Sequence, residues 1–378
     1  MDAAPAPAFA SDDAPARRRA VAALLDDARR RLVAAAWIWW PGYLAAGLTL
    51  ATALVVAPIT GHSLDVAGAG GVAGELSELL VVALLGMLAW RFVQIARARP
   101  PEGPTRALGR WLAGLAIRDD RWVHAVHTLA VVTVFSVSFG VLKGAIAILV
   151  PFGWDIAFME ADRWLHGGRL PHEWLAPLLA SPPVLLATNF VYNLWYFIVL
   201  GALVIAGARA GERRHGRRHL AFAVAFIAVW LVGGFFLATL FSSAGPCFVG
   251  PAGITGEYDA LMATLRATNE IVPLWAVSTQ DMLWAGHTGA RDGTLGISAM
   301  PSMHVATAIL LALYLGGFGR AYALAGWLFA SAIMLGSVLL AWHYAVDGYA
   351  GALVAWVLWR VVLRVLPARE AVSGPRPA

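Results

Sequence analysis

The chain contains eight apolar segments that are each long enough to cross a lipid bilayer, and this feature limits its possible folds more than any other. A helix needs roughly 20 apolar residues to cross the hydrocarbon core. The segments cover approximately residues 36–59, 76–96, 123–150, 184–207, 219–241, 304–319, 321–340 and 343–366. We therefore expect an all-α protein, a polytopic membrane helical bundle with about eight transmembrane helices.

The composition agrees with a membrane protein. Hydrophobic residues make up 60% of the chain and charged residues only 13%, whereas soluble domains carry about 25% charged residues. The 17 Trp residues suit the boundary between water and lipid. The single cysteine, Cys247, cannot form an internal disulfide or a cysteine-based metal cluster.

The distribution of arginine predicts the orientation, because cytoplasmic loops are enriched in basic residues. One set of loops, after segments two, four, six and eight, carries Arg97, Arg99, Arg106, Arg110, Arg118, Arg121, Arg209, Arg213, Arg214, Arg217, Arg218, Arg320, Arg360, Arg364 and Arg369. The alternate loops hold only Arg163, Arg169, Arg266 and Arg291. We predict that both termini are cytoplasmic. The same pattern accounts for the net charge of +5 without a nucleic-acid partner.

The chain is divided on this basis into three parts: a cytoplasmic leader (1–33), a transmembrane domain (34–366) and a cytoplasmic tail (367–378). The leader lacks the apolar core of a cleaved export signal and is expected to be partly helical. Abundant Ala, Gly and Arg with a single Lys suggests a GC-rich bacterial genome. We therefore expect a multi-pass protein of the bacterial inner membrane.

The outer loop 242–303 is too long to be only a connector. Its stretch 257–270 places Leu261, Leu265 and Thr268 at helical spacing. This pattern predicts an amphipathic helix that lies on the surface.

Two short stretches at the outer ends of segments carry the chemistry. Ser298-Ala-Met-Pro-Ser-Met-His304 enters segment six, and Trp342-His343-Tyr-Ala-Val-Asp347 enters segment eight. Residues four apart share a helix face, so Asp347 can reach one imidazole nitrogen of His343 and make the other more nucleophilic. One histidine can then attack phosphorus while the other protonates the leaving oxygen. The three side chains could instead bind zinc.

The paired motifs resemble those of the type 2 phosphatidic acid phosphatase superfamily. Pro301-Ser-Met-His304 and His343-x-x-x-Asp347 look like its last two motifs, in the form typical of the branch that contains fungal inositol phosphorylceramide synthase. The resemblance covers roughly segments three to eight. It implies that His343 forms a phosphohistidine, that Asp347 orients it and that His304 is the acid. It implies no metal or other cofactor.

The chain departs from the phosphatase branch at two basic positions. That branch has Ser-Arg ahead of its third motif, where this chain has Gly336-Ser337. Its first motif, Lys, six residues, then Arg-Pro, is expected near 241–248, a stretch with no basic residue here. Both departures favour the branch that resembles sphingolipid synthases.

Other residues are candidates for substrate contact. Lys143, the only lysine, could bind the substrate phosphate or reach out to the membrane surface. Arg291 and Ser302 are further candidates for the phosphate, Ser302 because it starts a helix. Asn189 and Tyr192 lie on one face of a predicted helix, in its outer half. They could form a polar wall for a headgroup, or they could hydrogen-bond to neighbouring helices.

The expected function is phosphoryl or phospho-headgroup transfer from a lipid phosphate or phospholipid at the outer face of the membrane, with transfer to a hydroxyl favoured over hydrolysis. A transporter would carry its polar residues near the midplane, whereas here they lie at one surface. A non-catalytic lipid-binding protein of the same fold is a further alternative, and protein partners are not predicted.

Overall fold

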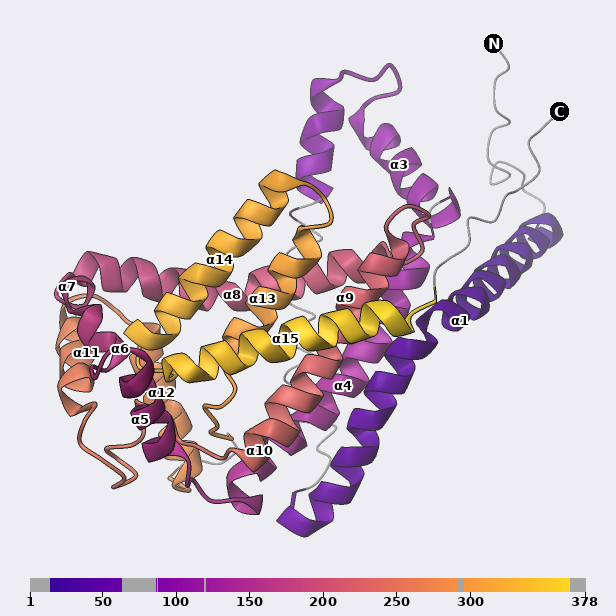
Figure 1. Cartoon of the computed structure of the whole chain (residues 1–378). Helices are drawn as coiled ribbons and strands as arrows, with labels where there is room; N and C mark the ends of the chain where they lie inside the picture. The colour runs from indigo at the N-terminus through magenta and orange to yellow at the C-terminus, as the bar shows by residue number, and fades with distance from the viewer. Residues whose placement is uncertain (1–13, 63–85, 87, 119, 291–295, 368–378) are drawn as a thin grey trace.

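The computed structural model describes residues 14–62, 86, 88–118, 120–290 and 296–367, and helices are the only regular secondary structure in these ranges (Figure 1). Six helical stretches of the described chain are long and apolar enough to cross a membrane. They are formed by α1 (Ala14–Thr60), α4 (Arg121–Leu149), α8 (Pro182–Ala208), α9 (Gly216–Leu231) with its continuations η2 (Val232–Leu237) and α10 (Ala238–Leu240), α14 (Arg320–Leu339) and α15 (Ala345–Val365). The predicted all-α membrane bundle is confirmed.

The predicted number of eight spans is met only in part. The second predicted segment, 76–96, lies mostly outside the described residues, although 88–97 are helical. The sixth is α13 (Met303–Leu315), whose 13 residues extend only about 20 Å. The hydrocarbon core is about 30 Å thick. A bundle that crosses the bilayer therefore places one end of α13 below the membrane surface.

Helix α13 lies at the centre of the bundle and packs against α8, α9, α14 and α15. It is short because its sequence defines both ends: Ser302 caps its start by accepting a hydrogen bond from the Val305 N–H, and glycines follow Leu315. Helix α1 packs along α4 at the side of this group. It runs without interruption through the predicted boundary between leader and membrane domain at residue 33.

Short helices gather at the end of the bundle away from the two termini (Figure 1). They are α5 (Asp155–Leu165), α6 (Pro171–Trp174), α7 (Ala176–Leu179), α11 (Asp259–Ile271) and α12 (Trp275–His287). Helix α11 confirms the amphipathic helix predicted at 257–270, since Leu261, Leu265 and Thr268 are its buried residues. Helix α3 (Pro104–Arg118) precedes α4.

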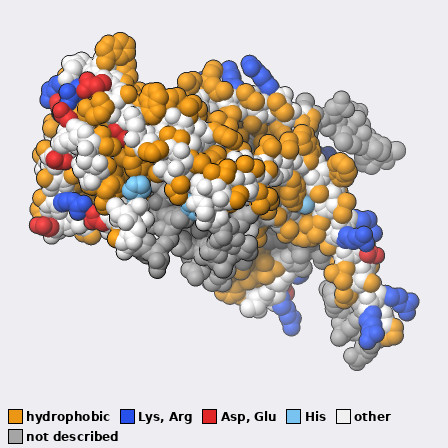
Figure 2. Space-filling model, turned by 90° about the horizontal axis from the view of Figure 1, so that it is seen from below, with side chains coloured by type: hydrophobic (Ala, Val, Ile, Leu, Met, Phe, Trp, Pro, Cys, Tyr) orange, Lys and Arg blue, Asp and Glu red, His pale blue; other side chains and the backbone are white. Residues whose placement is uncertain are grey.

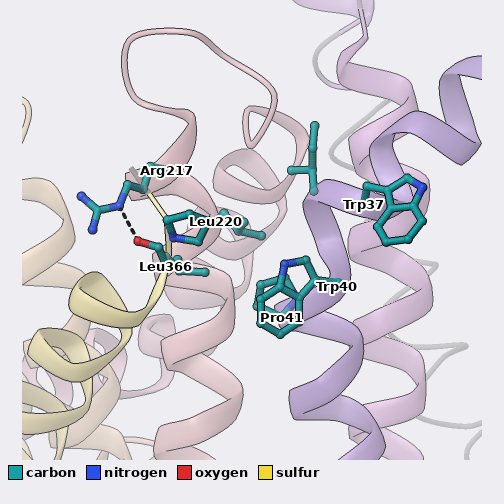
Figure 3. Close-up of a pocket in the computed structure, with 8 residues that line it drawn as sticks. Trp37, Trp40, Pro41, Arg217, Leu220 and Leu366 are labelled. Carbon is teal, nitrogen blue, oxygen red and sulfur yellow. Dashed lines mark hydrogen bonds between the residues drawn. The ribbon is translucent and has the colours of Figure 1, made fainter. Parts of the chain in front are cut away.

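The opposite end of the bundle is held by arginine side chains. Arg217 donates to the Leu363 and Leu366 carbonyls at the end of α15, and Arg218 donates to the Leu313 and Tyr314 carbonyls at the end of α13. These bonds satisfy carbonyls that a helix end leaves without partners. Figure 3 shows Arg217 and Leu366 there, beside a pocket that α1 lines with Trp37, Trp40 and Pro41.

Hydrophobic side chains dominate the face of the molecule shown in Figure 2, and acidic and basic side chains cluster mainly at its ends. A belt of this kind suits a protein whose middle contacts lipid and whose ends contact water. The orientation of the two ends remains a prediction from the arginine pattern.

Candidate active site

The two histidine motifs meet at the end of the bundle where the short helices gather. His304 is the second residue of α13, and His343 lies in the turn between α14 and α15. Their ring centroids are 6.0 Å apart. The structure therefore brings together two side chains that lie on separate elements.

Close packing of α13 and α15 sets this distance. The Ser302 backbone N–H donates to the Asp347 carbonyl at 2.9 Å. One turn further along α15, a Cβ atom on Gly351 would lie 2.5 Å from the Ser302 carbonyl oxygen. Only glycine fits this position without a shift of the backbone, so Gly351 allows the two motifs to lie side by side.

A backbone carbonyl fixes the tautomer of His343. The ring Nδ1 lies 2.9 Å from the Ala299 carbonyl oxygen. A carbonyl can only accept, so Nδ1 carries the proton and Nε2 keeps its lone pair. The side chain is buried, which holds the ring in this orientation. Nε2 is therefore the nitrogen that can act as a nucleophile.

Asp347 is fully buried beside the same nitrogen. Its Oδ2 accepts the Tyr344 backbone N–H at 3.0 Å and lies 3.4 Å from Nδ1 of His343. The nearer partner of Nδ1 is thus the Ala299 carbonyl, which sequence reasoning missed because a backbone oxygen has no residue-type signal. Asp347 places a carboxyl group next to the ring and also caps the first turn of α15.

Aromatic residues of α8 hold His304. The ring of Tyr192 stacks on it with centroids 4.7 Å apart, and the Trp195 ring lies 4.2 Å away. The Trp195 indole N–H donates to the Thr307 hydroxyl one turn along α13, at 2.9 Å. Tyr192, predicted to line a headgroup pocket, is therefore a neighbour of His304.

Lys143 of α4 lies near both histidines. Its charge acts on His304 and on His343, and its ammonium group donates to the Ser298 hydroxyl. The backbone approaches closely there as well, since a Cβ on Gly296 would overlap the Lys143 carbonyl. The Lys143 side chain is thus directed toward the two histidines.

The family model of the PAP2 superfamily matches residues 156–361, which is more than half of the chain. The chain belongs to the PAP2 superfamily. No curated protein and no solved structure matches it.

The PAP2 match contains both histidines and Asp347, whereas Lys143 precedes it. Membership of this superfamily suggests phosphatase or phosphotransferase activity, and two imidazoles with a carboxyl group beside one of them fit that chemistry. No group of three or more His, Cys, Asp or Glu side chains in the part of the chain that the structure describes has a metal-binding arrangement.

The stretch 241–248, where PAP2 phosphatases carry basic residues, is anchored here by an acidic side chain. The buried Asp155 of α5 accepts the Ala244 and Gly245 backbone N–H groups, both at 2.9 Å. It also accepts the Tyr344 hydroxyl at 2.9 Å. Sequence reasoning missed Asp155, because its partners lie in distant parts of the chain.

The other residues predicted to contact the substrate are Ser302, Asn189 and Arg291, and the described ones bond to the protein backbone. Ser302 is buried and uses its hydroxyl as the cap of α13. Asn189 accepts the Ala276 backbone N–H of α12 at 3.0 Å, which ties α8 to α12. Arg291 lies outside the described residues.

Proposed function

We propose that this PAP2 protein is an integral membrane enzyme that transfers a phosphoryl or phospho-headgroup from a lipid phosphate ester through a phosphohistidine at His343. The observation that carries this proposal is the hydrogen bond from Nδ1 of His343 to the Ala299 carbonyl. It leaves the lone pair on Nε2, and the ring of His304 lies 6.0 Å away, centroid to centroid. Nucleophilic catalysis with a separate acid requires two such groups close together.

The reaction proceeds in two steps. The Nε2 lone pair attacks phosphorus and forms a phosphorus–nitrogen bond, while the bond to the leaving oxygen breaks and His304 gives that oxygen its proton. An acceptor hydroxyl then attacks phosphorus and passes its proton to His304, and the electrons of the phosphorus–nitrogen bond return to Nε2. The Asp347 carboxylate stabilises the positive charge that develops on the His343 ring.

The substrate phosphate needs a cation, and Lys143 is our candidate. PAP2 phosphatases supply basic residues from the stretch at 241–248 and from the position of Ser337, and this chain has none at either place. The Lys143 ammonium lies near both histidines. The start of α13 at Ser302 adds the favourable end of a helix dipole.

Transfer to a hydroxyl is proposed over simple hydrolysis. The paired motifs have the form typical of the branch with inositol phosphorylceramide synthase, and the missing basic residues point the same way. Tyr192 stacks on the His304 ring, and Asn189 lies one turn before it on α8, where both would line a pocket for the headgroup. The arginine pattern supports an orientation with this end of the bundle at the periplasm or cell exterior.

The test uses the purified protein in detergent with EDTA, as wild type and as His343→Ala. Each is incubated with phospholipids and polyprenyl phosphates, with and without inositol and ceramide, and the lipid products are identified by mass spectrometry. We expect a new phosphodiester product from the wild type alone. Free phosphate as the only product would make the enzyme a phosphatase. Activity that EDTA abolishes and zinc restores would contradict the metal-free mechanism.

A further inference from the structure

Helix α5 lies alongside the turn that carries His343, and its contacts are not explained by the catalytic pair. Asp155 and Asp162 are seven residues apart, or two helical turns, so they lie on one face of α5. Both side chains are almost fully buried. Buried carboxylates are rare unless they are paired or hydrogen-bonded, so their partners indicate what the helix does.

Asp162 caps α15 from outside that helix. Its Oδ2 accepts the Ala345 N–H at 2.7 Å, and its Oδ1 accepts the Val346 N–H at 2.9 Å. These are the first two backbone N–H groups of α15, which have no acceptor within the helix itself. A carboxylate at this end is also favoured by the helix dipole.

Three acceptors thus fix the four residues that begin with His343. The Ala299 carbonyl holds the His343 ring, Asp155 holds the Tyr344 hydroxyl, and Asp162 holds the next two N–H groups. Because the chain continues directly from His343 into these groups, a shift of α15 relative to α5 would move the imidazole. A displacement of about 1 Å can reduce catalysis about 100-fold.

The residues after Asp162 strengthen the same contact. Arg163 pairs with Glu257 at 2.6 Å, and the His166 ring lies 3.0 Å from the Tyr349 hydroxyl, one turn further along α15. Gly167 has φ 70°, in the left-handed region that favours glycine, and ends the helix. The stretch Asp162-Arg-Trp-Leu-His166-Gly167, at the end of α5, therefore holds this helix against the start of α15 and against the loop before α11.

We infer that Asp162 is a positioning residue, which holds the start of α15 so that Nε2 of His343 stays aligned with the substrate phosphorus. This inference rests on the proposed function, since it assigns Asp162 a role through the His343 nucleophile. Asp162 itself is directed at backbone groups and contacts no reacting atom. Its loss should lower the turnover rate more than it changes substrate binding.

The charge state of Asp162 supplies a second readout. Burial raises the pKa of Asp162 to about 6, against hydrogen bonds from Ala345 and Val346 that lower it. The ionisable groups that interact with it are Asp347, His166, Tyr258 and Tyr349, and Arg163 and Glu257 in turn act on Tyr258. Since the pKa is raised in the folded protein, proton uptake favours the folded state. When the pH falls through 6, Asp162 becomes protonated and loses its negative charge. This protonation does not lower the free energy of unfolding.

The experiment compares wild type, Asp162→Ala, Asp162→Asn and Glu160→Gln. Glu160 is the matched control, since it is an exposed carboxylate on the same helix. We expect kcat to fall about 10- to 100-fold in Asp162→Ala, with KM little changed. Asp162→Asn, whose amide oxygen still accepts one N–H group, should recover part of the rate, and Glu160→Gln should match wild type.

The pH profile separates positioning from folding. Wild-type activity should fall below pH about 6, and Asp162→Asn should lose this acid limb. Wild-type kcat in Asp162→Ala, or an unchanged acid limb in Asp162→Asn, would overturn the inference. If Asp162→Ala does not fold, the kcat and the pH profile of Asp162→Asn test the positioning role in its place. Turnover that survives in His343→Ala would instead contradict the proposed function on which the inference rests.

Discussion

At the scale of single residues, His343 and His304 have different surroundings, which suit the different roles that we propose for them. The His343 ring is fixed by a carbonyl on one side and has its second nitrogen available. The His304 ring is held by the faces of Tyr192 and Trp195. A ring held by stacking keeps its orientation while its nitrogens exchange a proton, which suits an acid that later acts as a base.

The role of Lys143 gives a prediction at this scale. Lys143→Met should lower kcat/KM about 100-fold, because a preorganised cation at the reacting phosphate has an effect of this order. Ser298→Ala is the control, since it removes the only hydrogen-bond partner that the structure gives the Lys143 ammonium and leaves the charge in place. Steady-state kinetics of the two variants would test this. Equal losses in both would contradict a role for the charge.

The sequence identified the candidate catalytic residues because their motifs are local. His343 and Asp347 are four residues apart, and Pro301-Ser-Met-His304 is contiguous. Their partners could not be predicted in the same way. Ala299 acts through its backbone, and Asp162 binds a residue 183 positions away, a contact that no periodicity in the chain encodes.

At the scale of elements, the contact between α13 and α15 determines whether the motifs meet. Gly351→Ala would bring a Cβ to 2.5 Å from the Ser302 carbonyl oxygen. Overpacking of this kind destabilises a fold by about 1–3 kcal/mol and here would also separate the two histidines. We therefore expect a lower unfolding temperature and a large loss of activity.

Gly140→Ala is the matched control for this element. Gly140 is also in a helix, α4, but a Cβ there meets no atom within 4 Å, and Ala is the better helix former. Thermal unfolding and activity assays of both variants would test the contact. Wild-type activity in Gly351→Ala would show that the two helices tolerate a wider spacing.

Most spanning helices could be predicted from hydropathy, because continuous apolar runs of sufficient length have one plausible structure in a membrane. The predicted segments 123–150 and 184–207 correspond closely to α4 and α8. The segment at 304–319 gave a shorter helix, because the glycines after Leu315 end α13 early. Helices α5 and α12 lack such runs and depend on tertiary contacts, so sequence reasoning did not predict them.

At the scale of the whole molecule, the two ends differ in chemistry. One end carries the arginines that cap α13 and α15, and the other carries the histidine pair under the short helices. The arginine pattern predicts that the histidine end faces outward. A lipid phosphate would then reach the site from the outer leaflet.

Cysteine labelling in intact cells tests this orientation. Cys247 is buried, so the natural chain should give a low background. We expect a membrane-impermeant maleimide to label Ser278→Cys, an exposed position on α12, without permeabilisation. Arg213→Cys, an exposed position between α8 and α9, should react only after the membrane is opened. The reverse pattern would mean that the active site faces the cytoplasm.

In the mechanism that we propose, His343 carries the phosphorylated intermediate. The most direct measurement is to mix the purified enzyme with its lipid phosphate substrate, denature it within seconds in alkali and locate the modified residue by peptide mass spectrometry. We predict phosphorus on the peptide that contains His343, and none in His343→Ala. Modification of His304 instead, or turnover without any modified histidine, would rule out His343 as the nucleophile.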